Sequence, residues 1–237
     1  DAVAAAFEKY PGKIAAVMLE PVVGNMGCVP PRPGYLEFLR EITQKNDTLL
    51  IFDEVMTGFR LSFGGAQERF GIRPDMTALG KIIGGGLPIA AYGGRSDIMD
   101  KVAPVGPVYQ AGTLSGNPLA VSAGLAMLTY LKEHPEVYDH LETLGRTLVK
   151  EPMPGVSVNR VGSMFTFFFQ EGEVTDYETA KRSDTKRFAK FFHCMVDLGV
   201  YPAPSQFEAG FLSAAHTLDY INYTVETARE FFAAEPR

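Results

Sequence analysis

One lysine and one aspartate in this sequence stand where both side chains could meet the same ligand. Lys81 lies among Leu79, Ile82 and Ile83, and three glycines follow it at residues 84–86. An apolar setting disfavours the ammonium form of a lysine and so favours a neutral, nucleophilic amine. The glycines would let a ligand ring lie close to the backbone. In the alternative interpretation, the stem of Lys81 covers apolar surface and its head reaches water.

The elements around this lysine are predicted to form a parallel sheet. Residues 14–19 and 49–52 are apolar runs of strand length, typical of strands buried on both faces, and a helix is predicted between them over 34–45. Strand, helix and strand in this order make a βαβ unit, so the sequence predicts an α/β fold. A further strand is predicted over residues 76–79.

Ligands of open parallel sheets bind beyond the carboxyl ends of the strands. Glu20 and Asp53 stand at the ends of the first two predicted strands, and Lys81 follows the third. Each acid alone has an alternative role, since carboxylates at strand ends often cap the following turn. A carboxylate and a lysine from neighbouring strands would suit pyridoxal phosphate. The lysine would form a Schiff base with its aldehyde, and the aspartate would keep its pyridine nitrogen protonated.

Composition excludes several other classes of protein. A net charge of -6 and the lack of a Lys/Arg-rich block argue against nucleic-acid binding. No apolar run approaches the roughly 20 residues that cross a bilayer, and the sequence from Asp1 shows no signal-peptide pattern. Cys28 and Cys194 lack metal-site spacing, as do the four histidines, so we expect no metal. We expect a soluble protein of a reducing compartment, the cytoplasm, or the plastid stroma in a plant or alga.

The sequence that follows Lys81 gives weaker evidence for a binding site. The segment 106–116 holds small polar groups that could donate hydrogen bonds to a phosphate, namely Tyr109, Gly112, Thr113 and Ser115. Such a segment can equally be only a loop. Asn117 and Pro118 are typical of a helix start, and the helix is predicted to reach residue 131.

A domain boundary is predicted at the break that follows the next helix, which runs over 135–150. Domain 1–150 would be the ligand-binding large domain, and domain 151–237 would be a smaller α+β domain. The phenylalanines of the second domain are interpreted as its core. Its predicted strands are 156–160, 164–169, 200–201 and 211–213, and its predicted helices are 175–180, 183–198 and 217–234.

Several stretches, in the same order, resemble the class III aminotransferases of pyridoxal-phosphate fold type I. They are Phe52–Val55 and Leu79–Pro88. Three more stretches are similar to the family members that move an amino group within one substrate: Tyr109–Pro118, Val161–Phe165 and Ala203–Phe211. The resemblance runs over essentially the whole chain. It implies part of a fold type I large domain, with a mostly parallel sheet and helices on both faces, plus a smaller C-terminal domain.

The resemblance implies a role for each matching residue. Lys81 would be the Schiff-base lysine and Asp53 the partner of the pyridinium nitrogen. Val55 would pack on one face of the ring, and Asn25 would lie near the ring hydroxyl. The cofactor would be pyridoxal 5'-phosphate or pyridoxamine 5'-phosphate.

The resemblance also implies a homodimer with shared sites. Gly112 and Thr113 would contact the cofactor phosphate of the opposite subunit, and Tyr109 would approach the same site. Glu208 falls where many members of the family have an arginine that binds a substrate carboxylate. An acid there would suit an amine or aldehyde group instead.

The chain departs from the family pattern at its beginning. Family enzymes are longer there, so we expect this chain to be the C-terminal part, without the residues that cup the phosphate in the same subunit or stack on the ring. The break near Glu151 is also shorter than expected. Alternatives are therefore a transaminase with an external amino acceptor, a non-enzymatic phosphate-binding module, or an inactive remnant.

Overall fold

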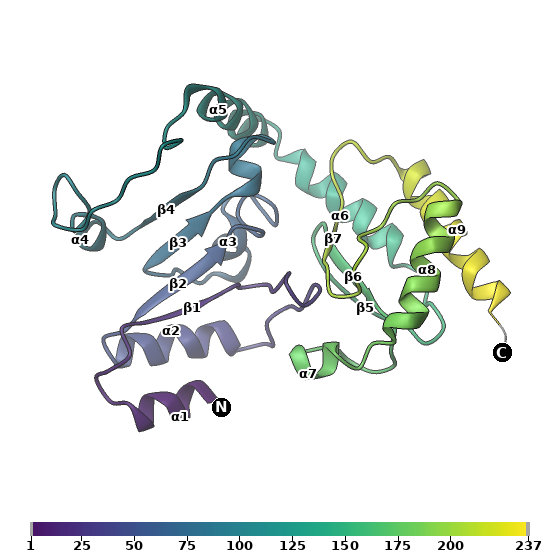
Figure 1. The fold of residues 1–237 in the computed structure, drawn as a ribbon, viewed down its shortest axis with the longest axis horizontal. Helices are drawn as coiled ribbons and strands as arrows, with labels where there is room; N and C mark the ends of the chain where they lie inside the picture. The colour runs from purple at the N-terminus through teal and green to yellow at the C-terminus, as the bar shows by residue number, and fades with distance from the viewer. Residues whose placement is uncertain (1, 236–237) are drawn as a thin grey trace. The chain divides into compact units, whose positions relative to one another are not determined.

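The structure is a computed structural model that describes residues 2–235. It forms two compact units (Figure 1). The first unit contains the chain up to Pro21 and Arg32–His134, and the second contains Val22–Pro31 and the chain from Pro135. The predicted boundary after residue 150 differs from this division. Helix α6 (Glu136–Leu148) groups with the second unit because it packs against α9 (Leu218–Ala234).

The first unit contains a four-stranded sheet in the order β1-β2-β3-β4. Strands β1 (Ala16–Leu19), β2 (Leu49–Glu54) and β3 (Met76–Leu79) are parallel, and β4 (Ala91–Gly94) is antiparallel to β3. Helix α2 (Tyr35–Lys45) connects β1 to β2. The predicted α/β fold and its βαβ unit are confirmed.

Helices cover one face of this sheet. Leu36 and Leu39 of α2 pack with Leu50 and Phe52 of β2, and α1 (Ala2–Lys9) adds Val3 to the same core. The prediction that residues 14–19 are buried on both faces is wrong. In the described residues β1 is an edge strand, and Met18 on the other face is 58% exposed. Apolar composition predicted the strand, but burial depends on neighbours that the pattern does not reveal.

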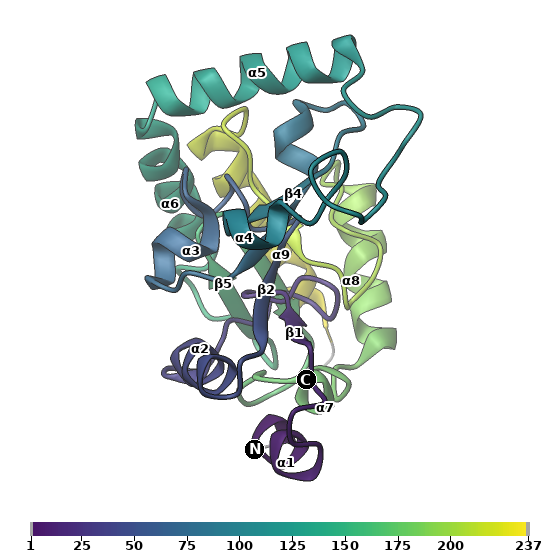
Figure 2. The ribbon, with the colours of Figure 1, turned by 90° about the vertical axis from the view of Figure 1, so that its left-hand side faces the viewer.

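Beyond β3 the chain forms the 3₁₀ helix η1 (Lys81–Gly84), β4 and the short helix α4 (Ser96–Met99). An extended segment then leads to α5 (Pro118–Glu133), as Figures 1 and 2 show. The predicted start of α5 is confirmed, because Asn117 Oδ1 accepts a hydrogen bond of 2.9 Å from Ala120 N. Helix α5 packs closely on η1, since a Cβ at Gly124 would overlap the carbonyl oxygen of Ile83.

The second unit is built on an antiparallel sheet in the order β5-β6-β7. Its strands are β5 (Ser157–Val161), β6 (Met164–Phe168) and β7 (Gly210–Phe211), and its helices are α6, α7 (Tyr177–Ala180), α8 (Thr185–Asp197) and α9. The predicted phenylalanine core is confirmed, with Phe169, Phe188 and Phe191 in one cluster. The predicted strand at 200–201 is wrong, because Val200 N instead donates to Met195 O and closes the end of α8.

One ion pair joins a helix and a strand of this unit. Both nitrogens of the Arg160 guanidinium fork donate to Glu142 at 2.8 and 2.9 Å, and Arg146 donates to the same carboxylate. The hydrogen bonds from Arg160, aided by those from Arg146, outweigh partial burial and lower the pKa of Glu142 to about 2.

Stability should therefore depend on Glu142 in acid. The unfolded carboxyl titrates near pH 4.3, so its contribution is fully present above that pH and is lost as pH falls towards 2. We expect Glu142→Gln to lower the free energy of unfolding by about 1 kcal/mol at pH 7, allowing for solvent screening, and to lower it much less at pH 2. Urea unfolding at both pH values measures this. An equal loss at both would contradict the titration.

Candidate active site

Two neighbouring strand ends position Asp53 and Lys81. Asp53 is the penultimate residue of β2 and pairs in parallel register with Ala78 of β3. Lys81 begins η1, two residues beyond the end of β3. Since β2 and β3 are parallel, both residues lie at the carboxyl edge of the sheet, where ligands of such sheets bind. The structure thus brings them to one edge, as the sequence predicted.

Among residues 2–235, Asp53 has a hydrogen bond to only one of its two carboxylate oxygens. Oδ1 accepts a hydrogen bond of 3.0 Å from Val55 N, as expected of a carboxylate that caps the turn after its strand. In the described part of the chain no group donates to Oδ2. The side chain is half-buried. Capping the turn and binding a ligand are therefore compatible roles, and the cap holds the carboxylate at the strand end.

Glu54 points to the opposite face and is 1% exposed. Its Oε2 accepts from Thr57 Oγ1 at 2.9 Å and from Ala66 N at 2.6 Å, and its Oε1 accepts from the Gln67 side chain at 2.9 Å. These donors come from the turn after β2 and from α3 (Gly65–Phe70). Because neighbouring side chains on a strand alternate between faces, fixing Glu54 also fixes the direction of Asp53.

Replacing Glu54 by glutamine should destabilise the protein by about 2–3 kcal/mol, because the new amide would face buried donors that then lack an acceptor. The denaturant midpoint measures the loss. Glu68→Gln is the matched control. Glu68 lies nearby on α3 and accepts from Gly64 N, but it is exposed, so its replacement should cost much less. Equal losses in the two variants would refute the role of Glu54.

The side chain of Lys81 is exposed, so the predicted apolar setting is wrong. Ile83 is buried, and its carbonyl oxygen lies against Gly124 of α5, so this isoleucine belongs to the packing of η1 on α5. Lys81 has φ +50, in the left-handed region that disfavours residues other than glycine. Such a conformation costs about 1–2 kcal/mol and is found at sites where the direction of a side chain matters. The amine is accessible to a ligand.

Val55 links the two strand ends and lines a pocket. Its side chain packs on Gly80, where a Cβ would lie 3.3 Å from Val55 Cγ1. The pocket measures ≈ 540 Å³, and Asp53 shares a sheet face with two of its lining residues through the register Asp53–Ala78–Tyr92. Its lining residues are Val55, Ala78, Leu79, Pro88, Ile89, Ala90, Ala91, Tyr92, Gln110, Gly112, Leu114, Ser115 and Gly116.

The predicted phosphate contacts occupy the extended segment before α5. Gly112 lines the pocket with Val55, whereas Tyr109 and Thr113 do not line it. Tyr109 is 84% exposed, and Gly112 and Thr113 are exposed as well. Gly112 O accepts from Ser115 N at 2.9 Å, which closes a turn around Thr113. Tyr109, Gly112 and Thr113 are therefore accessible to solvent in the first unit.

Asn25 and Glu208 lie on two adjoining loops of the second unit. The loop 22–31 carries Asn25, and its Gly27 N donates a hydrogen bond of 2.7 Å to Phe207 O of the loop 203–209, which carries Glu208. Glu208 is exposed and lines a pocket of ≈ 180 Å³. Asn25, predicted to lie beside the ring hydroxyl, and Glu208, predicted to contact substrate, are therefore on loops that are hydrogen-bonded to each other.

Several polar residues that line this pocket were assigned no role from the sequence, among them Thr166 of β6, Gln206 and His216. The only local signal is a threonine between phenylalanines in a buried strand, where an apolar residue is expected.

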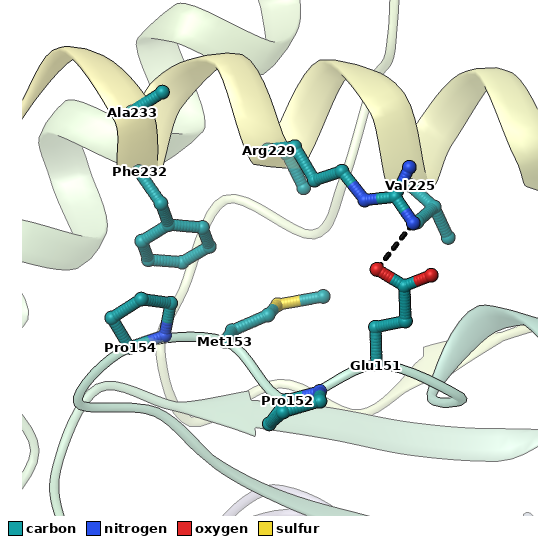
Figure 3. Close-up of a pocket in the computed structure, with 9 residues that line it drawn as sticks. Glu151, Pro152, Met153, Pro154, Val225, Arg229, Phe232 and Ala233 are labelled. Carbon is teal, nitrogen blue, oxygen red and sulfur yellow. Dashed lines mark ion pairs between the residues drawn. The ribbon is translucent and has the colours of Figure 1, made fainter.

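A further pocket of ≈ 270 Å³ lies between residues 151–154 and α9 (Figure 3). Met153, Pro154 and Phe232 form its apolar wall, and Glu151 is ion-paired with Arg229 at one side. This is the helix break predicted near Glu151. Its two charged groups pair with each other, so the pocket presents no reactive group.

The sequence matches the family described as Aminotransferase class-III over residues 1–206. A glutamate-1-semialdehyde 2,1-aminomutase of Sulfurihydrogenibium sp. (strain YO3AOP1) is 58% identical over 98% of this chain and 56% of its own length. The crystal structure of an omega-transaminase from Sphaerobacter thermophilus superposes with a TM-score of 0.87 at 30% identity, covering 98% of this chain and 54% of that one. A glutamate-1-semialdehyde-aminomutase from Pseudomonas aeruginosa PAO1 in complex with PMP gives a TM-score of 0.82 at 25% identity, over 98% of this chain and 54% of that one.

The chain belongs to the class III aminotransferase family. Its similarity to named aminomutases is the more specific finding, and it extends over nearly all of the chain. The chain spans about half the length of the curated relatives it matches. Across residues 2–235, the helices are all too short or too polar to cross a membrane.

Proposed function

We propose that this chain supplies the catalytic lysine, the ring-nitrogen acid and the substrate acid of a glutamate-1-semialdehyde 2,1-aminomutase. This enzyme is an isomerase that converts glutamate 1-semialdehyde to 5-aminolevulinate for porphyrin, chlorophyll and other tetrapyrrole synthesis. The observation that carries the proposal is the placement of Asp53 and Lys81 at neighbouring parallel strand ends in a chain 58% identical to an aminomutase.

The side chains at this edge fit pyridoxal or pyridoxamine 5'-phosphate. Lys81 offers an exposed amine, Asp53 offers the oxygen Oδ2, and Val55 offers an apolar surface between them. The cofactor, when bound, supplies an aldehyde or amine and an electron-accepting ring. Gly112, Thr113 and Tyr109 would hold its phosphate across a subunit interface, and Asn25 would meet its ring hydroxyl.

Each residue then has a defined task. Lys81 Nζ would carry a proton between the substrate carbon that bears the amine and the cofactor carbon bonded to the same nitrogen, as a general base and acid. Asp53 Oδ2 accepts a hydrogen bond from the ring nitrogen and favours its protonated form. Glu208 holds the substrate amine or aldehyde end and repels a second carboxylate.

The same proposal includes a homodimer. Apolar side chains are exposed on the segment before α5 and along α5 itself, and a second subunit would cover them. They are Val105, Val108, Tyr109, Leu114, Leu119, Val121 and Leu125. The reaction would take place in the cytoplasm, or in the plastid stroma of a plant or alga.

A transaminase with an external amino acceptor is the second candidate, because an omega-transaminase has a similar fold at 30% identity, but the 58% identity to an aminomutase favours the first. The two functions differ in what they consume. We expect the purified holoenzyme to form 5-aminolevulinate from glutamate 1-semialdehyde without any added keto acid. An absolute requirement for a keto acid would replace the proposal with the transaminase. The absence of a borohydride-reducible absorbance would contradict both.

A further inference from the structure

We propose that Thr166 is a positioning residue of this site, whose hydroxyl holds the Asn25 loop and the Glu208 loop in one arrangement. This inference rests on the proposed function, which gives Asn25 a contact with cofactor and Glu208 a contact with substrate. Thr166 would act through these two residues, by holding the loops that carry them. One buried side chain of β6 would therefore position both the contact of Asn25 with the cofactor and the contact of Glu208 with the substrate.

The hydroxyl of Thr166 lies between the two loops. Thr166 is 4% exposed, and its Oγ1 accepts a hydrogen bond of 2.9 Å from Cys28 N, three residues after Asn25. The same hydroxyl is 3.2 Å from Glu208 O and 2.8 Å from Phe165 O, so its one proton can be donated to either carbonyl. A hydroxyl can donate one hydrogen bond while it accepts others, whereas a methyl group can do neither.

Close packing leaves the Asn25 loop little freedom. Gly27 has φ +86, and a Cβ there would lie 2.5 Å from Phe168 Cζ and 3.1 Å from Thr166 Cγ2. The backbone of the loop therefore lies directly on β6. Gly27 N also donates to Phe207 O at 2.7 Å, so the loop is bonded both to Thr166 and to the neighbouring loop.

Gln206 fastens the other loop to the same strand region. Its side chain is 3% exposed; Nε2 donates to Phe167 O at 2.8 Å, and Oε1 accepts from Phe169 N at 3.2 Å. The amide thus satisfies strand backbone groups on either side of Phe168. Because Gln206 fixes this loop to β6, we expect a shift of the backbone near Thr166 to move Glu208 as well. Glu208 lies only two residues after Gln206.

Removing the hydroxyl should disturb both contacts at once. Thr166→Val keeps the shape but leaves the buried amide of Cys28 without an acceptor, which a local shift of the loop would relieve. A misplacement of about 1 Å at a reacting group can lower the rate about 10²-fold. Since Glu208 is proposed to bind substrate, part of the effect should be on KM.

The experiment compares three variants of the holoenzyme. We expect Thr166→Val to raise KM for the semialdehyde and to lower kcat/KM about 10- to 100-fold, while Thr166→Ser keeps nearly wild-type values. Thr227→Val is the matched control, because Thr227 is also buried but bonds only to Tyr223 O within α9. It should leave the kinetics unchanged. Wild-type KM and kcat in a folded Thr166→Val enzyme, or no recovery with serine, would overturn the proposal.

Amide hydrogen exchange provides a readout that needs no turnover. In Thr166→Val, exchange should accelerate together in residues 22–31 and 205–209 but not in α9, and serine should restore both. Acceleration in only one loop would refute the coupling. Coupled exchange in an enzyme that makes no 5-aminolevulinate would support the coupling and count against the proposed function. If the valine variant does not fold, Thr166→Cys can be tested in its place, because cysteine has a similar volume and its thiol is a weaker hydrogen-bond donor.

Discussion

Replacing Lys81 by alanine is expected to abolish multiple turnover, lowering kcat by at least about 10²- to 10⁴-fold, the loss typical of a positioned acid-base group. The lysine has two tasks in the proposed reaction, the covalent bond to the cofactor and the proton transfer. Alanine can perform neither. Lys81→Arg should be equally inactive, because a guanidinium keeps the charge but stays protonated.

This result would report on chemistry rather than on folding. Lys81 is exposed and already in a left-handed conformation that alanine would share, so the unfolding midpoint should hardly change. Lys132→Ala, at an exposed lysine of α5 in the same unit, is the control and should behave as wild type. Borohydride reduction followed by peptide mass analysis should find the cofactor attached to the Lys81 peptide. Steady turnover by Lys81→Ala would end the assignment of this lysine.

The main features of the site could be predicted because they depend on local order. Apolar runs of strand length with a helix between them predict parallel neighbours, and parallel neighbours place residues that follow the strands at one edge. The sequence alone therefore predicts that Asp53 and Lys81 lie at the same edge of the sheet, and the parallel pairing of β2 with β3 agrees. The start of α5 at Asn117 was predicted for the same reason, since a cap involves residues only three apart.

What the sequence did not predict depends on distant contacts. The packing of η1 on α5 involves Gly124, more than forty positions beyond Lys81 along the chain. The association of the Asn25 loop with the second unit depends on the bond between Cys28 and Thr166, which are 138 positions apart. No periodicity or spacing contains such information. The resemblance to the family supplied roles for these residues, but not the contact that holds their loops together.

Replacing Asp53 by asparagine should lower kcat by about 10²- to 10³-fold, the size of effect seen when one electrostatic stabiliser is lost from a site. The asparagine would still offer an oxygen to Val55 N, so the turn after β2 should persist. It would carry no charge to favour a protonated ring nitrogen. Binding of the cofactor should weaken as well, which absorbance during dialysis would measure.

This substitution separates the two interpretations of Asp53. If Asp53 only caps the turn, asparagine is a good replacement, and activity and stability should both stay close to wild type. If it pairs with the ring nitrogen, stability should persist while turnover is lost, and Asp53→Glu should restore part of the rate. Asp97→Asn, at an exposed acid of α4 that pairs with Arg95, controls for the loss of one negative charge. A folded Asp53→Asn enzyme with undiminished kcat would leave Asp53 as a turn cap and remove the ring-nitrogen role from the site.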